Sequence, residues 1–199
     1  MKINDLLKIV LLSVIGFVLE MIGGYASLLF GTYALYISHA LASLIVAPVF
    51  FVLCHKVHKR GTLFLYYILM GLIYTIMGFW PMLIIYAAAA VIAELLVFKP
   101  ENYSNNRRLT VTYVVAQTVT ALHGLFFVLF IGLDGMARLF PDMFDDATIK
   151  MTGEFMGKTG NVVAVIVIQI VIAFIGAIFG IFIYSKFFAK RKKEKTLLN

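Results

Sequence analysis

The chain has 199 residues, of which 62% are hydrophobic and 14% charged, and its mean hydropathy is +0.99. These values exclude an ordinary soluble domain, and the single cysteine, Cys54, excludes an internal disulfide. The net charge of +7 would suit nucleic-acid binding if it lay on one soluble face, but its distribution along the chain is explained by membrane topology.

A transmembrane helix needs about 20 apolar residues, and six such runs account for most of the chain. We therefore expect an all-α integral membrane protein: a single membrane domain over residues 1–199 with six transmembrane helices and a long external loop between helices five and six. The expected spans are about 6–24, 33–54, 62–79, 81–98, 109–131 and 161–184, followed by a basic cytoplasmic tail, 185–199.

The first run follows two lysines and resembles a signal peptide at first sight. It is longer than a signal core of about 7–15 residues and contains Glu20, so a retained helix is expected. Ser13 and Gly16 lie along one side of this helix. Small residues let helices approach closely in a membrane, so these two predict either internal packing or a docking face for a partner membrane protein.

The third and fourth runs are expected to meet in a tight hairpin at Trp80 and Pro81, with Pro81 at a first helical position where its missing N–H costs nothing. Glu94 lies four residues from the inner end of the fourth run. We expect its side chain to reach the interface and to pair with Lys99.

The longest connection, 132–160, is acidic overall and also rich in apolar residues, among them Met136, Phe140, Met143 and Phe144. Long loops in compact domains are usually functional or disordered. The apolar residues favour a folded cap over the outer face rather than a loose tether.

Charge fixes the orientation. The gaps between the runs, taken with both termini, form two alternating sets, and one set holds fourteen of the seventeen lysines and arginines. Basic loops stay cytoplasmic, so both termini are expected inside. The inner set is Lys2, Lys8, Lys56, Lys59, Arg60, Lys99, Arg107, Arg108, Lys186, Lys190, Arg191, Lys192, Lys193 and Lys195. Only Arg138, Lys150 and Lys158 lie outside; if the loop's own carboxylates pair with them, an acidic substrate is disfavoured.

Ionisable side chains inside a membrane are costly and mark functional sites. The topology puts Glu20, His39 and His123 at one depth, in the outer leaflet beneath the long loop. These three groups are expected either to bind a ligand or to pair with one another as structural partners.

Further polar and aromatic residues surround that depth, and they are typical of a small-molecule pocket or of an ordinary aromatic belt. The candidate substrate-binding residues are Glu20, Tyr36, His39, Trp80, Tyr86, Gln117, His123 and Asn161. No catalytic motif is present: there is no G-x-S-x-G, H-E-x-x-H, P-loop or C-x-x-C. We expect no enzyme, no metal site and no intrinsic cofactor, and without a Walker motif the chain cannot couple ATP by itself.

Four short stretches carry a family resemblance: Lys56–Gly61, Met70–Ile73, Met77–Met82 and Ala93-Glu94. They resemble the Trep_Strep (MptD-like) group of substrate-binding S components of energy-coupling factor (ECF) transporters. The resemblance is strongest over residues 50–105.

The resemblance implies a multi-pass protein of a bacterial plasma membrane that binds a vitamin-like micronutrient near its outer face. Its partners would be a transmembrane T component and two cytoplasmic ATPases, which use the ATP. S components commonly meet the T component through an A-x-x-x-A stripe on helix one. Here the corresponding stretch offers Ser13 and Gly16 instead, at a spacing of three.

Two alternatives stay open at this stage. His39 and His123 at similar depth would suit axial ligation of a haem iron, which makes haem a candidate substrate. The second alternative is a different class of transport protein, a stand-alone proton- or ion-coupled carrier, in which Glu20 and the histidines would form a proton relay.

Overall fold

The computed structural model describes residues 1–141 and 145–189, and all regular structure there is helical. The α-helices are α1 (Ile3–Ala26), α2 (Ala34–Val57), α3 (Thr62–Ile76), α4 (Pro81–Val97), α5 (Asn106–Ala121), α6 (His123–Phe126), α7 (Leu133–Leu139), α8 (Asp146–Met156) and α9 (Thr159–Ile183). Short 3₁₀ segments, η1 (Ser27–Tyr33) and η2 (Pro100–Ser104), and π segments, η3 (Phe127–Ile131) and η4 (Tyr184–Phe188), complete the described chain.

The all-helical, membrane-type architecture is confirmed. Within the described residues, four helical stretches are long and apolar enough to cross a membrane: Ile3–Gly31, Tyr36–Val57, Asn106–Ile131 and Thr159–Phe188. Helices α3 and α4 are apolar but have only 15 and 17 residues. At 1.5 Å per residue they are about 23 and 26 Å long, against a hydrocarbon core of about 30 Å.

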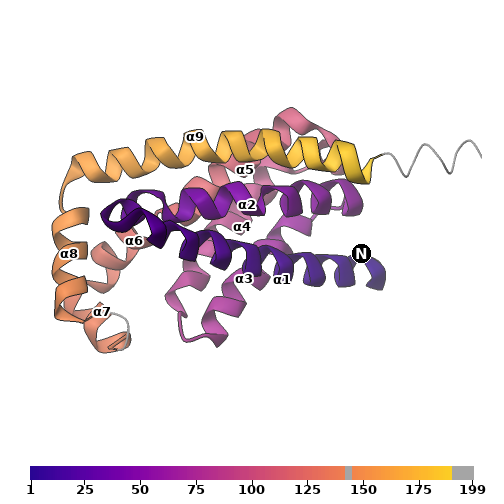
Figure 1. Ribbon diagram of the computed structural model, residues 1–199. Coiled ribbons are helices and arrows are strands. Elements are labelled where there is room, and N and C mark those ends of the chain that lie inside the picture. The colour runs from indigo at the N-terminus through magenta and orange to yellow at the C-terminus, as the bar shows by residue number, and fades with distance from the viewer. Residues whose placement is uncertain (142–144, 190–199) are drawn as a thin grey trace, which may run out of the picture.

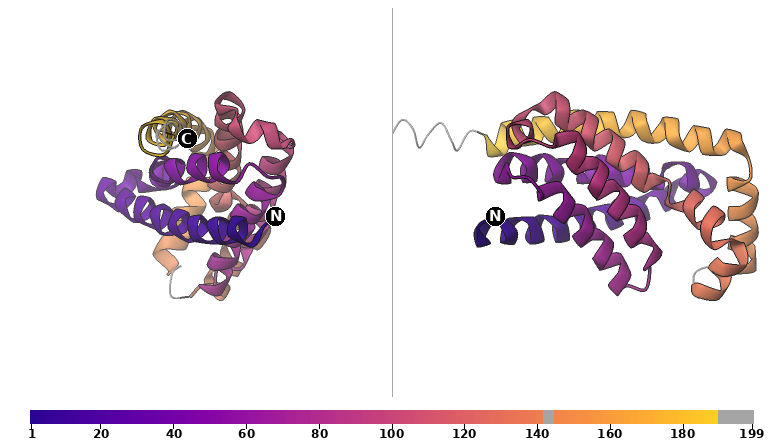
Figure 2. Two further views of the ribbon diagram at one scale, coloured as in Figure 1. Left: turned by 90° about the vertical axis from the view of Figure 1, so that its right-hand side faces the viewer. Right: turned by 180° about the vertical axis from the view of Figure 1, so that it is seen from behind.

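The long helices α1, α2 and α9 run side by side along the molecule (Figure 1). Helix α1 begins and α9 ends at the same end of this bundle, whereas α6, α7 and α8 lie at the opposite end. The α3–α4 hairpin runs obliquely to the long helices, and α8 stands across the end of α9 (Figure 2). We call the end formed by α7 and α8 the cap end and the other the terminal end.

Small residues bring α9 and α2 into backbone contact. A Cβ on Gly176 would lie 3.1 Å from Cα of Leu44, and one on Gly180 would lie 2.9 Å from the carbonyl oxygen of Ala47. Helices in lipid gain no hydrophobic stabilisation from each other, so close packing of this small-xxx-small kind supplies much of their association.

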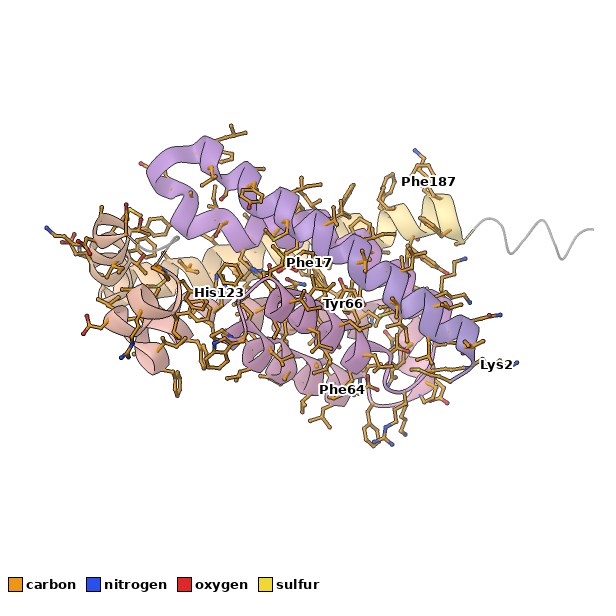
Figure 3. The ribbon with its side chains drawn as sticks, turned by 90° about the horizontal axis from the view of Figure 1, so that it is seen from below. Lys2, Phe17, Phe64, Tyr66, His123 and Phe187 are labelled. Atoms are coloured by element: carbon orange, nitrogen blue, oxygen red, sulfur yellow. The ribbon has the colours of Figure 1, made fainter. Side chains whose placement is uncertain are left out.

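Ser13 and Gly16 face inward on α1. Ser13 is fully buried and its hydroxyl donates to the carbonyl of Ile9 at 2.8 Å. A Cβ on Gly16 would lie 2.6 Å from the hydroxyl oxygen of Tyr66 on α3, and Figure 3 shows Tyr66 beside Phe17 of α1. This burial favours internal packing over a docking role for the two residues.

The expected single helix 109–131 is interrupted. Helix α5 ends at Ala121, and Leu122 N donates to the carbonyl of Val119, three residues back. The next carbonyl, that of Thr120, accepts from Nδ1 of His123 at 3.0 Å. A side chain that takes a main-chain acceptor competes with the helix ladder, so the helix restarts as α6 and continues as a π turn.

Glu94 does not pair with Lys99 in the described residues, and that prediction is wrong. Its carboxylate accepts from the backbone N–H groups of Gly61 (2.6 Å) and Phe64 (3.3 Å), which belong to the start of α3, and from the hydroxyl of Tyr103 (2.7 Å). The first N–H groups of a helix lack partners within it, so Glu94 caps α3 from α4. Pro81 does begin α4, as predicted.

The long connection 132–160 contains two helices rather than an extended loop. Asp145 caps α8 by accepting from Thr148 N at 2.8 Å, and hydrogen bonds from Thr148 lower the pKa of the exposed Asp145 carboxyl. Met136 of α7 and Thr152 of α8 are buried against the bundle. Of the apolar residues predicted to fold this segment, Met143 and Phe144 lie outside the described residues, as does most of the basic tail, 190–199.

Candidate functional site

A cavity of about 660 Å³ lies at the cap end, a size common for small-molecule sites. Its walls come from the end of α1, the start of α2, the α3–α4 hairpin and α6, and α9 forms another side. Met136 of α7 with Thr152 and Met156 of α8 line it as well, so the connection 132–160 contributes to the walls. Figure 3 shows His123 of this cavity near the end away from Lys2.

Glu20 lies in the cavity wall although only 5% of it is exposed. The hydroxyl of Tyr86, on α4, donates to its Oε1. Nδ1 of His39, on α2, is 3.8 Å from the same oxygen. Glu20 therefore connects three helices in the cavity wall, and Tyr86 supplies a hydrogen bond that offsets the burial of its carboxyl group.

Thr120 contacts both imidazoles. Its carbonyl accepts from Nδ1–H of His123 at 3.0 Å, so the neutral His123 ring has its lone pair on Nε2. When the Thr120 hydroxyl donates to the carbonyl of Gln117 at 3.0 Å, it accepts from Nε2–H of His39 at 2.8 Å. In that arrangement the neutral His39 presents its Nδ1 lone pair towards Glu20.

This arrangement has a consequence for Glu20 and His39. A lone pair and an ionised carboxylate facing each other at 3.8 Å would repel, so the pair is favoured when it holds one proton, on either the carboxyl or the imidazole. In both forms the pair is neutral overall, which is the least costly state in a low-dielectric setting.

The cap is fastened to the bundle by Asn161, at the start of α9. Its Oδ1 accepts from the hydroxyl of Tyr36 on α2 at 2.9 Å, and its Nδ2 donates to the carbonyl of Phe155 on α8 at 3.0 Å. The rings of Tyr36 and Phe155 meet edge to face, with centroids 4.5 Å apart. One amide thus joins α2, α8 and α9 at the cavity rim.

The candidate residues divide into three groups in the structure. Glu20, Tyr36, His39 and His123 line the cavity. The imidazole rings of His39 and His123 lie close together, with their centroids 5.8 Å apart. Tyr86 and Asn161 do not line it but hydrogen-bond to residues that do. Gln117 is buried on α5 outside the lining, and Trp80 is 50% exposed at the hairpin, away from the cavity.

Gln169 and Thr152 are among the polar lining residues that escaped the sequence analysis. Gln169 lies in the middle of α9 and is 1% exposed, and Thr152 lies on α8. An uncharged amide alone within an apolar run, as in Ile168-Gln169-Ile170, was the available signal for Gln169. For Thr152 there was none, because the helix that carries it was read as part of a loop.

The three cations expected outside, Arg138, Lys150 and Lys158, stand apart from the cavity. Arg138, Lys150 and Lys158 are exposed, do not line it, and form no ion pair within the described residues. One carboxylate of the same connection, Asp142, lies outside those residues. Across the described chain, no group of three or more His, Cys, Asp and Glu side chains is arranged to hold a metal ion.

The comparisons with known proteins agree with this architecture. The family model described as a hypothetical bacterial integral membrane protein (Trep_Strep) matches residues 3–190, nearly the whole chain. The chain belongs to the Trep_Strep family. No curated protein and no solved structure shows a significant match. Trep_Strep membership establishes an integral membrane protein, in agreement with the four long apolar stretches.

Proposed function

We propose that this protein is the substrate-binding S component of an ECF-type importer. The observation that carries the proposal is the cavity of about 660 Å³ at one end of a helical membrane protein, with Glu20, His39 and His123 in its wall and α7 and α8 beside it. A pocket of this size with few convergent polar groups suits capture of a small molecule.

The proposed topology has six crossings with both termini in the cytoplasm. Helices α3 and α4 cross as the short members, helped by local thinning of the bilayer around them. Apart from Arg138, Lys150 and Lys158, the described basic residues lie near the start of α1, around the α2–α3 and α4–α5 connections and after α9. These segments belong to the terminal end (Figure 1). The positive-inside rule then puts the cap end outside the cell, where a nutrient arrives.

The chain would work with partners. It has no nucleotide-binding motif, so a T component and two cytoplasmic ATPases would supply the coupling. Because Ser13 and Gly16 are buried, the surface of α1 offered to a T component is its exposed apolar face, which includes Leu7, Leu11 and Val18.

Two experiments test the proposal. Affinity purification of the tagged chain from its own membranes should recover a transmembrane protein and two ATPases in a stoichiometric complex. Mass spectrometry of small molecules extracted from the purified chain should identify a retained substrate. Liposomes containing the chain alone should not accumulate that substrate, and uptake should appear when the partners and ATP are added.

One observation favours a second candidate, a stand-alone proton-coupled carrier. Glu20, His39, Thr120 and His123 form a continuous chain of titratable and hydrogen-bonding groups. Liposomes that contain only this protein would then accumulate the substrate when a pH gradient is imposed, with no partner present. Such uptake would replace the S-component proposal.

Haem is less favoured as the substrate than a compact polar molecule. Two of the four imidazole nitrogens bond to Thr120, which leaves Nε2 of His123 and Nδ1 of His39 to ligate iron. Because Nδ1 of His39 faces Glu20, ligation by both rings requires the His39–Glu20 contact to break. An absorbance band on adding haemin that is lost in the His39→Ala/His123→Ala double variant would reverse this preference.

A further inference from the structure

We propose that the cavity selects a small organic cation that donates several N–H hydrogen bonds, such as an amidine, an alkylammonium or a protonated amino-heterocycle. This inference rests on the proposed substrate-binding role of the cavity and adds the chemical class of the ligand. It follows from the polar groups of the lining, which include a carboxyl group and further hydrogen-bond acceptors but no lysine or arginine.

Gln169 lines the cavity and holds an unpaired acceptor just behind its surface. The hydroxyl of Ser43 donates to the carbonyl of Ala40 at 2.7 Å, so it accepts from Nε2 of Gln169 at 3.2 Å. This contact fixes the orientation of the amide and leaves Oε1 as the other end. Within the described residues, Oε1 of Gln169 is buried without a hydrogen-bond partner. This oxygen has almost no accessible surface, so a ligand in the cavity reaches it only when the Gln169 side chain turns, and the turn would give a partner to a buried carbonyl that is otherwise costly.

Glu20 and the two histidines add acceptors on other walls. The Thr120 contacts leave lone pairs on Nδ1 of His39 and Nε2 of His123, and only Oε1 of Glu20 is engaged by Tyr86 and His39. The carboxyl of Glu20 also supplies the one negative charge that this lining can develop. A cation would displace the proton that the Glu20–His39 pair holds when the cavity is empty.

No lysine or arginine belongs to the described lining, so an anionic ligand would meet no fixed positive charge there. The remaining lining hydroxyls do not change this balance. The hydroxyl of Tyr36 is committed to Asn161 and that of Ser27 to the carbonyl of Gly24. The hydroxyl of Tyr74 donates to the sulfur of Met21 at 3.8 Å, and those of Tyr25, Ser38 and Thr152 can act as donor or acceptor.

The apolar part of the lining suits a flat cation. Tyr74, Phe79 and Phe127 contribute aromatic rings from α3, the hairpin and η3. Aromatic faces attract cations, more strongly when water is excluded. The cavity therefore combines acceptors that define the cationic head of a ligand with rings that accept a planar body.

Three benzene derivatives of similar size test the inference: benzamidine, which is cationic and donates N–H bonds, benzyl alcohol, which is neutral, and benzoate, which is anionic. Binding to the full chain in lipid nanodiscs is measured by calorimetry, with empty nanodiscs as the reference for partitioning. Benzamidine should bind at least about 10-fold more tightly than benzyl alcohol, the effect of one charge-assisted hydrogen bond, and benzoate should show no binding.

Variants assign the selectivity to its source. Glu20→Gln and Gln169→Leu should each weaken benzamidine binding about 10-fold or more and leave benzyl alcohol within about 2-fold. Glu101→Gln makes the same chemical change as Glu20→Gln at an exposed carboxylate outside the cavity and should change nothing. Equal affinities for the three probes, tighter binding of benzoate, or no benzamidine binding to the wild-type chain would each overturn the inference.

The outcome is independent of the transport proposal. Recovery of a complex with a T component and ATPases together with benzoate selectivity would leave the S-component role intact and refute the ligand class. Benzamidine selectivity without any such complex would support the ligand class and count against the importer.

Discussion

Removing the carboxylate of Glu94 should destabilise the protein at the end remote from the cavity. Two of its three contacts are short, to Gly61 N at 2.6 Å and to the Tyr103 hydroxyl at 2.7 Å, and the one to Phe64 N is longer at 3.3 Å. Tyr103 is fully buried, and burial with the adjacent Glu94 carboxylate raises its pKa, so it remains a donor with no water to replace Glu94.

The size of the effect follows from these contacts. A hydrogen bond to a charged group contributes about 1.5–3 kcal/mol. The net loss is smaller for a backbone N–H at a helix start, because water can replace part of the lost hydrogen bond. Glu94→Ala should therefore lower the free energy of unfolding by about 2–4 kcal/mol. Glu94→Gln keeps one acceptor oxygen and should cost about half as much.

The assay is reversible unfolding in mixed micelles titrated with SDS. Tyr103→Phe should show a coupling energy with Glu94→Ala of at least about 1 kcal/mol in a double-mutant cycle. Glu101→Ala, at an exposed carboxylate, and Lys99→Ala should each stay within about 0.5 kcal/mol of wild type. A decrease in the free energy of unfolding below about 0.5 kcal/mol for Glu94→Ala, or a larger decrease for Lys99→Ala than for Glu94→Ala, would refute the capping role of Glu94. Such a result would favour the Glu94–Lys99 ion pair instead.

Three further outcomes are expected. Gly180→Leu should separate α9 from α2 and cost at least about 2 kcal/mol in the same unfolding assay, whereas Gly160→Ala, where an added Cβ meets nothing within 4 Å, should be tolerated. Tyr36→Phe removes the bond to Asn161 and should raise amide hydrogen exchange in α8 several-fold, since a bond of about 1 kcal/mol corresponds to a factor of about five; unchanged exchange would show that the ring contact with Phe155 is sufficient. In intact cells, an impermeant maleimide should label Lys158→Cys but reach Lys2→Cys only after permeabilisation, and the reverse pattern would invert the proposed topology.

Hydropathy predicted where the apolar helices lie but not where they end. The third run was expected to reach residue 79, yet α3 ends at Ile76, and Gly78 adopts a φ of 95° in the hairpin. The fifth run is apolar through residue 131, but α5 ends at Ala121. Hydropathy does not register a hydrogen bond such as that from His123 to the Thr120 carbonyl, which decides where this helix is interrupted.

The candidate site shows the same division. Topology alone put Glu20, His39 and His123 at one depth, and the structure brings all three to one cavity. Depth does not give the direction in which a side chain points, so Trp80 was included although it faces away, and Gln169 was omitted although it lines the wall. The direction in which a side chain points depends on how the helices pack, and the residue pattern of a single chain does not contain that information.

The short connection between α8 and α9 has a mechanical consequence. Helix α8 ends at Met156 and α9 begins at Thr159, so the cap continues almost directly into the longest helix of the chain. Helix α9 runs from the cap end to the terminal end (Figure 1). The cap therefore cannot swing as an independent flap. A displacement of the cap would push or tilt helix α9, which is stiff and spans the molecule. Movement caused by a solute at the cap end would therefore be transmitted to the terminal end.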